Sequence, residues 1–173
     1  MDHDTLQIPC IKTRMNQIAL LLTFIFITCP ITLSQEKPDR MDQDQTAMTI
    51  SLDDYQWKKR VLVLFASSGQ NEHYKMQKEV LSADKEGLSE RDMVLISVFD
   101  QGKAYVNGQQ VSDTSAETIK QRLGESGSRF TVILIGKDGT TKLRKNHILP
   151  IDELFRTIDR MPMRQREMRD SGK

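Results

Sequence analysis

Three short apolar runs without regular polar alternation constrain this chain more than any other feature. They span Arg60–Ala66, Met93–Phe99 and Phe130–Ile135. A strand with one face in water alternates apolar and polar residues, whereas a strand covered on both faces is apolar throughout. The runs therefore predict three central strands of a sheet that carries helices on both of its faces.

The segments between these runs predict helices. A helix is expected from about Gln70 to Glu86, with Gly87 as its C-terminal stop. The pair Thr114-x-x-Glu117 is typical of a capping box and predicts the start of a second helix, which ends at Gly124. Between the second run and this helix, Lys103–Val106 is expected to form a short edge piece.

The last third of the chain predicts a hairpin and a closing helix. The hairpin turn is expected at Gly136–Gly139, and Thr140–Lys145 then returns as an antiparallel edge strand. Pro150 suits the first turn of a helix whose apolar residues recur at helical spacing until Pro162 interrupts it. The order strand, helix, strand, helix, strand, strand, helix predicts an α/β, thioredoxin-like fold, with a mixed central sheet and helices on both faces.

The first 34 residues have the pattern of a secretory signal peptide. Lys12 and Arg14 precede the uncharged run Ile18–Thr28, and small residues at Thr32 and Ser34 suit a peptidase that cuts after Ser34. An uncleaved anchor is one alternative, but a membrane span wants about 20 apolar residues and this run is shorter. A lipid-modified Cys29 is another alternative, which the bulky residues before it fit poorly. We expect an exported protein, periplasmic or extracellular.

Both cysteines of the chain, Cys10 and Cys29, lie in this leader, so residues 35–173 contain none. We expect residues 35–49 to be a disordered linker, residues 50–168 to be the thioredoxin-like domain and residues 169–173 to be a tail. The chain has 25 basic and 24 acidic residues, which excludes the strongly basic domain typical of nucleic-acid binding. No membrane span is expected once the leader is removed.

Three segments resemble the family called domain of unknown function 4174. They are Leu52–Ala66, Glu90–Asp92 before a strand, and Ile158–Met168, which is the most specific part. The resemblance covers roughly residues 48–168. It implies a thioredoxin-like domain close to peroxiredoxins, found in exported bacterial proteins and at the C-terminus of animal sushi-repeat-containing and coiled-coil-domain-containing matrix proteins. It brings no established activity.

In thioredoxin-like enzymes the nucleophilic cysteine follows the first strand, where a helix N-terminus lowers the pKa of the thiol. In this chain Ser67, Ser68 and Asn71 occupy that turn. A serine hydroxyl does not replace a thiolate, so thiol–disulfide exchange is not expected. The turn is a candidate site for a small anion, with Ser67 or Ser68 as a simple helix cap as the other interpretation.

His73 and Arg144 complete the candidate binding residues. His73 lies one helical turn after the serines. Arg144 on the expected edge strand suits a salt bridge or a substrate clamp, with a simply solvated side chain as the other interpretation. His73 and His147 have no zinc-ligand spacing, so no metal site is predicted, and neither a cofactor nor a catalytic residue is assigned. Methionines around Pro162 are expected either to form a contact surface or to pack on their own domain.

Together these features predict a non-redox binding or structural module whose partner is an unknown protein or a small anionic ligand. The alternative is a cysteine-independent enzyme, peroxide-handling or hydrolytic, that uses the turn after the first strand. A hydrolase needs a base beside the serine, and the chain has no Gly-x-Ser-x-Gly elbow. A third possibility is a small subunit of an envelope or matrix assembly that makes contact through residues 161–173.

Overall fold

The computed structural model describes residues 47–172. The predicted signal peptide with Cys10 and Cys29, and most of the predicted linker at 35–49, lie outside the described residues. No helix among the described residues is long and apolar enough to cross a membrane.

A six-stranded mixed sheet forms the centre of the domain, in the order β4-β3-β2-β1-β5-β6. Strands β1 and β2 are parallel, β5 runs antiparallel to β1, and the remaining neighbours are antiparallel. The strands are β1 (Arg60–Ala66), β2 (Met93–Phe99), β3 (Ala104–Val106), β4 (Gln109–Val111), β5 (Thr131–Ile135) and β6 (Thr141–Lys145). This topology confirms the predicted thioredoxin-like fold, and all three apolar runs are central strands.

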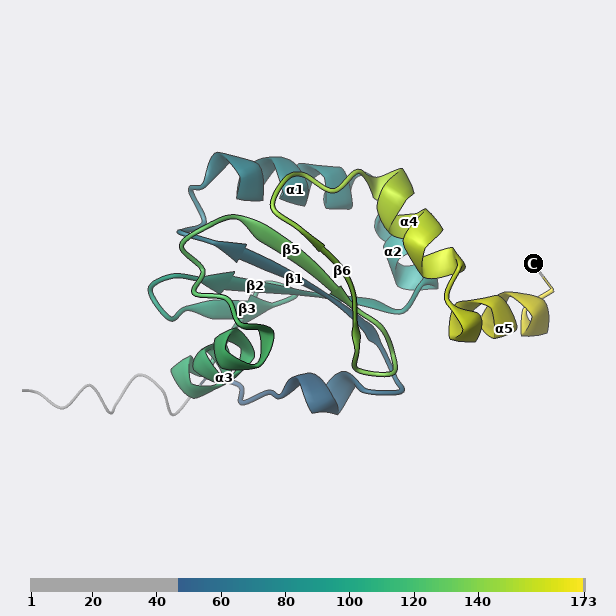
Figure 1. The fold of residues 1–173 in the computed structure, drawn as a ribbon, viewed down its shortest axis with the longest axis horizontal. Coiled ribbons are helices and arrows are strands. Elements are labelled where there is room, and N and C mark those ends of the chain that lie inside the picture. Colours follow the sequence, from purple (N-terminus) through teal and green to yellow (C-terminus); the bar gives the residue numbers. More distant parts are fainter. Residues whose placement is uncertain (1–46, 173) are drawn as a thin grey trace, which may run out of the picture. The chain divides into compact units, whose positions relative to one another are not determined.

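After Arg60, strand β1 is apolar, and its two faces enter two different cores. Val61, Val63 and Phe65 pack on one face with Ile119 from α3 (Asp113–Leu123). Leu62 and Leu64 pack on the other face, under α1 (Glu72–Ser82) and α4 (Ile151–Asp159). Figure 1 shows α1 and α3 on opposite sides of the sheet.

Two helices replace the single helix predicted for residues 70–86, and this prediction was wrong. Helix α1 ends at Ser82, and Asp84 caps a second helix, α2 (Lys85–Glu90), by accepting a hydrogen bond from the backbone N–H of Gly87. Gly87 is therefore a buried residue inside α2 and not a stop. A Cβ atom there would lie 2.7 Å from the ring of Phe155, so glycine lets α4 approach α2.

Two further local predictions need correction. The cap of α3 is Ser112, whose hydroxyl accepts from the backbone N–H of Ser115, in place of the predicted Thr114 capping box. The piece predicted at Lys103–Val106 is β3, but β4 lies beyond it and forms that edge of the sheet. Gly124 ends α3 as predicted, with a left-handed φ of 66° that suits glycine.

The closing segment also differs in detail from the prediction. Pro150 is the residue before α4, and a short break at Met161 separates α4 from α5 (Pro162–Asp170). A short 3-10 helix (Leu52–Tyr55) precedes β1 and contributes Leu52 to the α3-side core. Strand β1 is thus preceded by this 3-10 helix and followed, after Ala66, by the turn predicted as a site.

Candidate functional site

The turn predicted as a site directly follows β1 and leads into α1. Asn71 caps α1, because its side-chain oxygen accepts a hydrogen bond of 3.2 Å from the backbone N–H of Tyr74. The predicted capping role of Ser67 or Ser68 is therefore wrong. Ser68 instead accepts from the backbone N–H of Gln70, and Ser67 is exposed and contacts the Asn71 amide at 3.4 Å.

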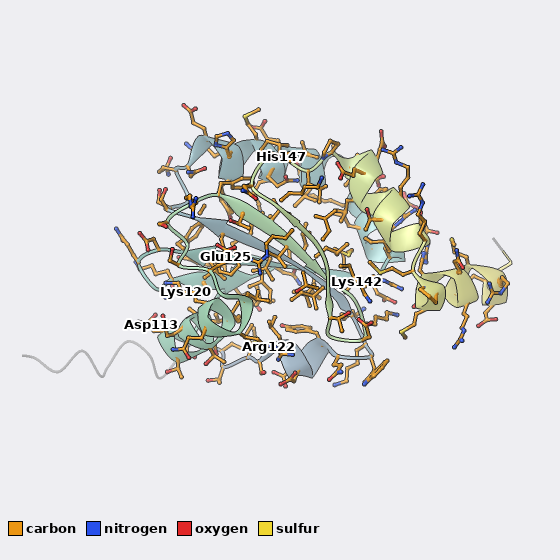
Figure 2. All side chains as sticks on the ribbon, viewed as in Figure 1. Asp113, Lys120, Arg122, Glu125, Lys142 and His147 are labelled. Atoms are coloured by element: carbon orange, nitrogen blue, oxygen red, sulfur yellow. The ribbon has the colours of Figure 1, made fainter. Side chains whose placement is uncertain are left out.

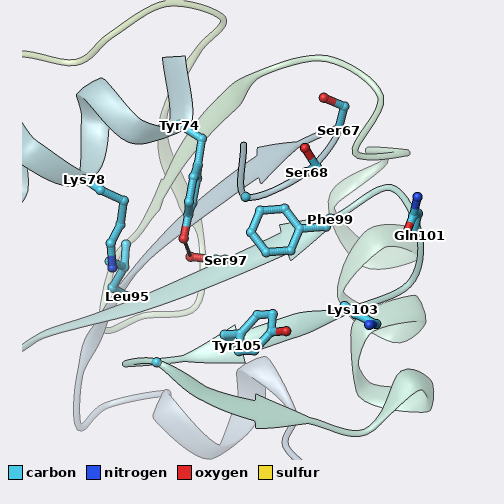
Figure 3. Close-up of a pocket in the computed structure, with 12 residues that line it drawn as sticks. Ser67, Ser68, Tyr74, Lys78, Leu95, Ser97, Phe99, Gln101, Lys103 and Tyr105 are labelled. Atoms are coloured by element: carbon cyan, nitrogen blue, oxygen red, sulfur yellow. Dashed lines mark hydrogen bonds between the residues drawn. The ribbon is translucent and has the colours of Figure 1, made fainter. Parts of the chain in front are cut away.

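A pocket of about 430 Å³, here called the strand-end pocket, opens beside this turn (Figure 3). The pocket lies where the parallel strands β1 and β2 end, which is the usual ligand crevice of open α/β sheets. Twelve residues line it: Ser67, Ser68, Gly69, Tyr74, Lys78, Leu95, Ser97, Phe99, Gln101, Lys103, Tyr105 and Gly108. The lining of the pocket thus comes from the turn after β1, one face of α1, one face of β2, and β3 with its flanking loops.

Three aromatic rings form much of the pocket wall. Phe99 on β2 packs edge-on against Tyr74 of α1 at 5.1 Å between ring centroids, and against Tyr105 of β3 at 5.9 Å. The Tyr74 hydroxyl lies 3.1 Å from the Ser97 hydroxyl, which is buried in the floor (Figure 3). This hydrogen bond holds the Tyr74 ring in the pocket wall, because it satisfies the buried Ser97 hydroxyl in an otherwise apolar strand.

The charge of the strand-end pocket is positive. Lys78 from α1 and Lys103 from the loop before β3 reach its lining, and no carboxylate lines it among the described residues. Neither lysine forms an ion pair with any described residue. The pocket therefore combines hydroxyl groups and aromatic surface with two cations that have no acidic partner within residues 47–172.

The structure separates the other predicted residues from this pocket. His73 stacks on Phe130 with 5.6 Å between the rings, and it does not line the pocket. Arg144 pairs with Glu125 and donates to the backbone carbonyl of Leu123 at 2.7 Å, so it ties β6 to the end of α3. Glu125 is labelled in Figure 2. Of the five candidates, only Ser67 and Ser68 line the pocket, with Asn71 beside them as the helix cap.

Sequence reasoning missed most of the pocket lining. No motif in the sequence points to Tyr74, Lys78 or Lys103 as site residues. One signal was available: Ser97 is a hydroxyl in the middle of the apolar run Met93–Phe99. A polar residue at a central-strand position needs a partner, and here the partner is Tyr74 in the pocket wall.

A second polar region, here called the charged cluster, lies at the opposite end of β1. It consists of Arg60, Glu90, Arg91, Asp92, Lys137, Asp159, Arg164 and Glu167. At its centre, the Arg60 guanidinium donates to both oxygens of Glu167 at 3.1 Å. Lys137 bridges Glu167 and Asp92, at 2.7 and 2.8 Å. The side chain of Arg60 is 1% exposed, so these partners, and not water, stabilise its positive charge.

The second half of the charged cluster joins α2, α4 and α5. Arg91 makes two hydrogen bonds to Asp159, and its guanidinium lies 4.1 Å from the centre of the Phe155 ring. Arg164 of α5 contacts Asp159 and donates to the backbone carbonyl of Glu90 at 3.0 Å. Charged side chains therefore connect two segments that are far apart in the sequence, Glu90–Asp92 and Ile158–Met168.

Two carboxylates of the charged cluster are held in their ionised form. Burial acts to raise the pKa of Glu167, but the hydrogen bond from Lys137 and the charges of Arg60 and Lys137 outweigh it, and the pKa is lowered. Burial also acts to raise the pKa of Asp92, and hydrogen bonds from Lys137 and Lys59 lower it below its usual range. Both shifts favour the ion pairs at neutral pH.

No group of three or more histidine, cysteine, aspartate or glutamate side chains that could hold a metal ion occurs within residues 47–172. Metal binding therefore does not distinguish the strand-end pocket from the charged cluster as a candidate site. The strand-end pocket has open space and two lysines without an ion-pair partner in the described part of the chain, whereas the charges of the charged cluster are paired, so the pocket is the better candidate site.

The family described as "Domain of unknown function (DUF4174)" matches residues 51–167. Among characterised proteins, "Sushi repeat-containing protein SRPX2" of Xenopus laevis is 27% identical over 120 residues, which is 68% of this chain and 26% of that protein. The human protein of the same name is 31% identical over 111 residues, 62% of this chain and 24% of that protein. The chain spans about a quarter of the length of these relatives.

Two solved structures are similar in arrangement. The reduced 2-Cys peroxiredoxin of Plasmodium vivax is 17% identical with a TM-score of 0.48, covering 68% of this chain and 85% of that chain. The mitochondrial 2-Cys peroxiredoxin from Plasmodium falciparum is 14% identical with a TM-score of 0.38, covering 72% of this chain and 85% of that chain.

Proposed function

This chain belongs to the DUF4174 family, and we propose that it is an exported, non-redox binding module whose ligand occupies the strand-end pocket. Export is supported by the leader pattern of the first 34 residues. The non-redox role is supported by the absence of cysteine from residues 35–173 and by the serines that follow β1. Thiol–disulfide chemistry needs a thiolate, which a serine hydroxyl does not provide.

The observation that carries the proposal is the composition of the strand-end pocket. Lys78 and Lys103 face a cavity of about 430 Å³ with no carboxylate among its described lining residues. Phe99 and Tyr105 offer flat apolar surface, and Ser67 and Ser68 offer hydroxyl groups at the rim. Pockets that bind small molecules combine apolar walls with a few polar groups that orient the ligand. A ligand that carries both negative charge and apolar surface satisfies these groups.

Hydrolysis is less well supported than binding. A serine nucleophile needs a base within about 3 Å of its hydroxyl, with a second group that orients the base. His73 is the nearest histidine in sequence, but its ring stacks on Phe130 and does not line the pocket. Among the described residues that do line the pocket, none is a histidine, an aspartate or a glutamate.

Titration with small anions tests the proposal. The purified chain is titrated with sulfate, citrate and benzoate while amide chemical shifts and the thermal midpoint are followed. We expect shifts at Ser68, Gln101 and Lys103, and weaker binding in Lys103→Ala. Lys75→Ala is the matched control, because Lys75 is an exposed lysine on α1 outside the pocket. If no anion shifts these amides, or if both variants respond equally, the binding proposal is wrong.

A further inference from the structure

A second cavity continues the strand-end pocket along β2. This helix-side pocket has a volume of about 460 Å³ and lies between α1, α2 and β2. Lys78 and Leu95 line both pockets, so the two pockets adjoin, and together they are here called the groove. Its floor is one face of β2, from Phe99 through Ser97 and Leu95 to Met93. Six residue steps of about 3.3 Å give a groove about 20 Å long.

The two ends of the groove differ in polarity. The strand-end pocket has hydroxyl groups and aromatic rings, whereas the helix-side pocket is lined mainly by aliphatic side chains, including Leu62, Leu81 and Leu88. Leu95 is only half-buried, because α1 covers this part of β2 incompletely. A ligand along the whole groove must therefore present apolar groups over most of its length.

Positive charge is spread along the groove at intervals. Lys103 lies at the strand-end pocket, Lys78 at the junction, and Lys85 at the helix-side pocket. None of the three forms an ion pair with a described residue. No carboxylate lines either pocket within residues 47–172. A ligand with a single anionic head would match one of these lysines and leave the other two unpaired.

We propose that the groove binds an extended acidic peptide of a partner protein, in which acidic and apolar side chains alternate. This inference rests on the proposed function, because the strand-end pocket forms one half of the groove. About six residues of extended chain span 20 Å, and alternate side chains of such a chain point to opposite sides. Apolar side chains then face Leu88, Leu95 and Phe99, while acidic ones reach the lysines at the rim.

The test compares probes of different charge and shape. The first probe is the capped peptide Glu-Leu-Glu-Phe-Glu-Leu, and the second replaces each glutamate by lysine. Oleate tests a lipid with one anionic head, and citrate tests the strand-end pocket alone. Each is titrated into the purified chain, with amide shifts measured at both ends of the groove, namely Gln101 and Lys103 at one end and Leu88 and Met93 at the other.

We expect the acidic peptide to shift both ends and the lysine peptide to shift neither. Lys85→Ala should weaken peptide binding about threefold, as expected for one exposed ion pair, while it leaves citrate binding unchanged. Removing Lys78, Lys85 and Lys103 together should weaken peptide binding about thirtyfold. Lys75→Ala is again the matched control and should bind the peptide as the unaltered chain does.

Four results would overturn the peptide proposal. If citrate binds but the peptide shifts only Gln101 and Lys103, with no effect of Lys85→Ala, the strand-end pocket binds anions and the extended occupant is wrong. If oleate shifts both ends and the peptide does not, the occupant is a lipid. Shifts that grow with protein concentration, without any probe, indicate a second copy of the chain. If no probe shifts either end, the proposed function fails as well.

Discussion

The two ends of β1 use charge in opposite ways. At its first residue, Arg60 is 1% exposed and its charge is neutralised by Glu167, within a network that joins α2, α4 and α5. After its last residue, Lys78 and Lys103 face open space without an acidic partner among the described residues. Paired charge thus holds helices in place at one end of β1, whereas the lysines beside the cavity at the other end are available to a ligand.

The largest expected effect is on the charged cluster. Glu167→Gln removes the negative charge that neutralises Arg60, and a buried guanidinium without a carboxylate is costly. We expect the free energy of unfolding to fall by about 3 kcal/mol, measured by urea denaturation at pH 7. Glu153→Gln is the matched control, because Glu153 pairs with Lys145 at 3.2 Å and both side chains are one-third exposed. The control should lose less than about 1 kcal/mol. Equal losses would contradict the distinction between the two kinds of pair.

Lowering the pH should also destabilise the protein through the charged cluster. The pKa values of Glu167 and Asp92 are lowered in the folded protein, so their stabilising contribution is present above the unfolded pKa of about 4 and is lost as pH falls through the folded values. We expect the urea midpoint to fall between about pH 5 and pH 3. In Glu167→Gln the fall should be smaller, because one of the carboxylates with a lowered pKa is gone. An unchanged pH profile in this variant would show that Glu167 does not titrate as proposed.

A smaller effect is expected in the wall of the strand-end pocket. Tyr74→Phe removes the hydroxyl that lies 3.1 Å from the Ser97 hydroxyl in the floor of the pocket. The free energy of unfolding should fall by about 1 kcal/mol, the usual contribution of one hydrogen bond. Tyr105→Phe is the matched control, since no hydrogen bond of its hydroxyl to a described residue is found, and its effect should be close to zero. If the two variants unfold alike, the Tyr74–Ser97 contact does not fix the wall.

The smallest effect on stability is expected at the lysines of the strand-end pocket. Lys78→Ala and Lys103→Ala should change the free energy of unfolding by no more than about 0.5 kcal/mol, because neither lysine forms an ion pair with a described residue. The same substitutions should weaken citrate binding about threefold each, measured by calorimetry. Substantial destabilisation would instead place these lysines with the charged cluster, as structural residues.

The sequence predicted the centre of this fold well and its polar regions poorly. The apolar runs located β1, β2 and β5 to within a residue, because burial on both faces leaves a strong local pattern. The break between α1 and α2 was missed because neither Ala83 nor Asp84 is a glycine or a proline. Gly87 suggested the end of a helix, but a glycine stands there because Phe155 packs against it. The partners in the charged cluster and in the pocket wall are set by tertiary folding, as in the pair Arg60–Glu167, which is 107 residues apart.

That separation also governs the order in which the domain becomes complete as the chain is made. Synthesis proceeds from the N-terminus, so Arg60 emerges long before the carboxylate that neutralises it. Until Glu167 arrives, β1 has a guanidinium at its first position whose burial is costly. Closing so long a loop comes late in folding. Burial of Arg60 at the start of β1 therefore waits for the segment Ile158–Met168, which carries Glu167.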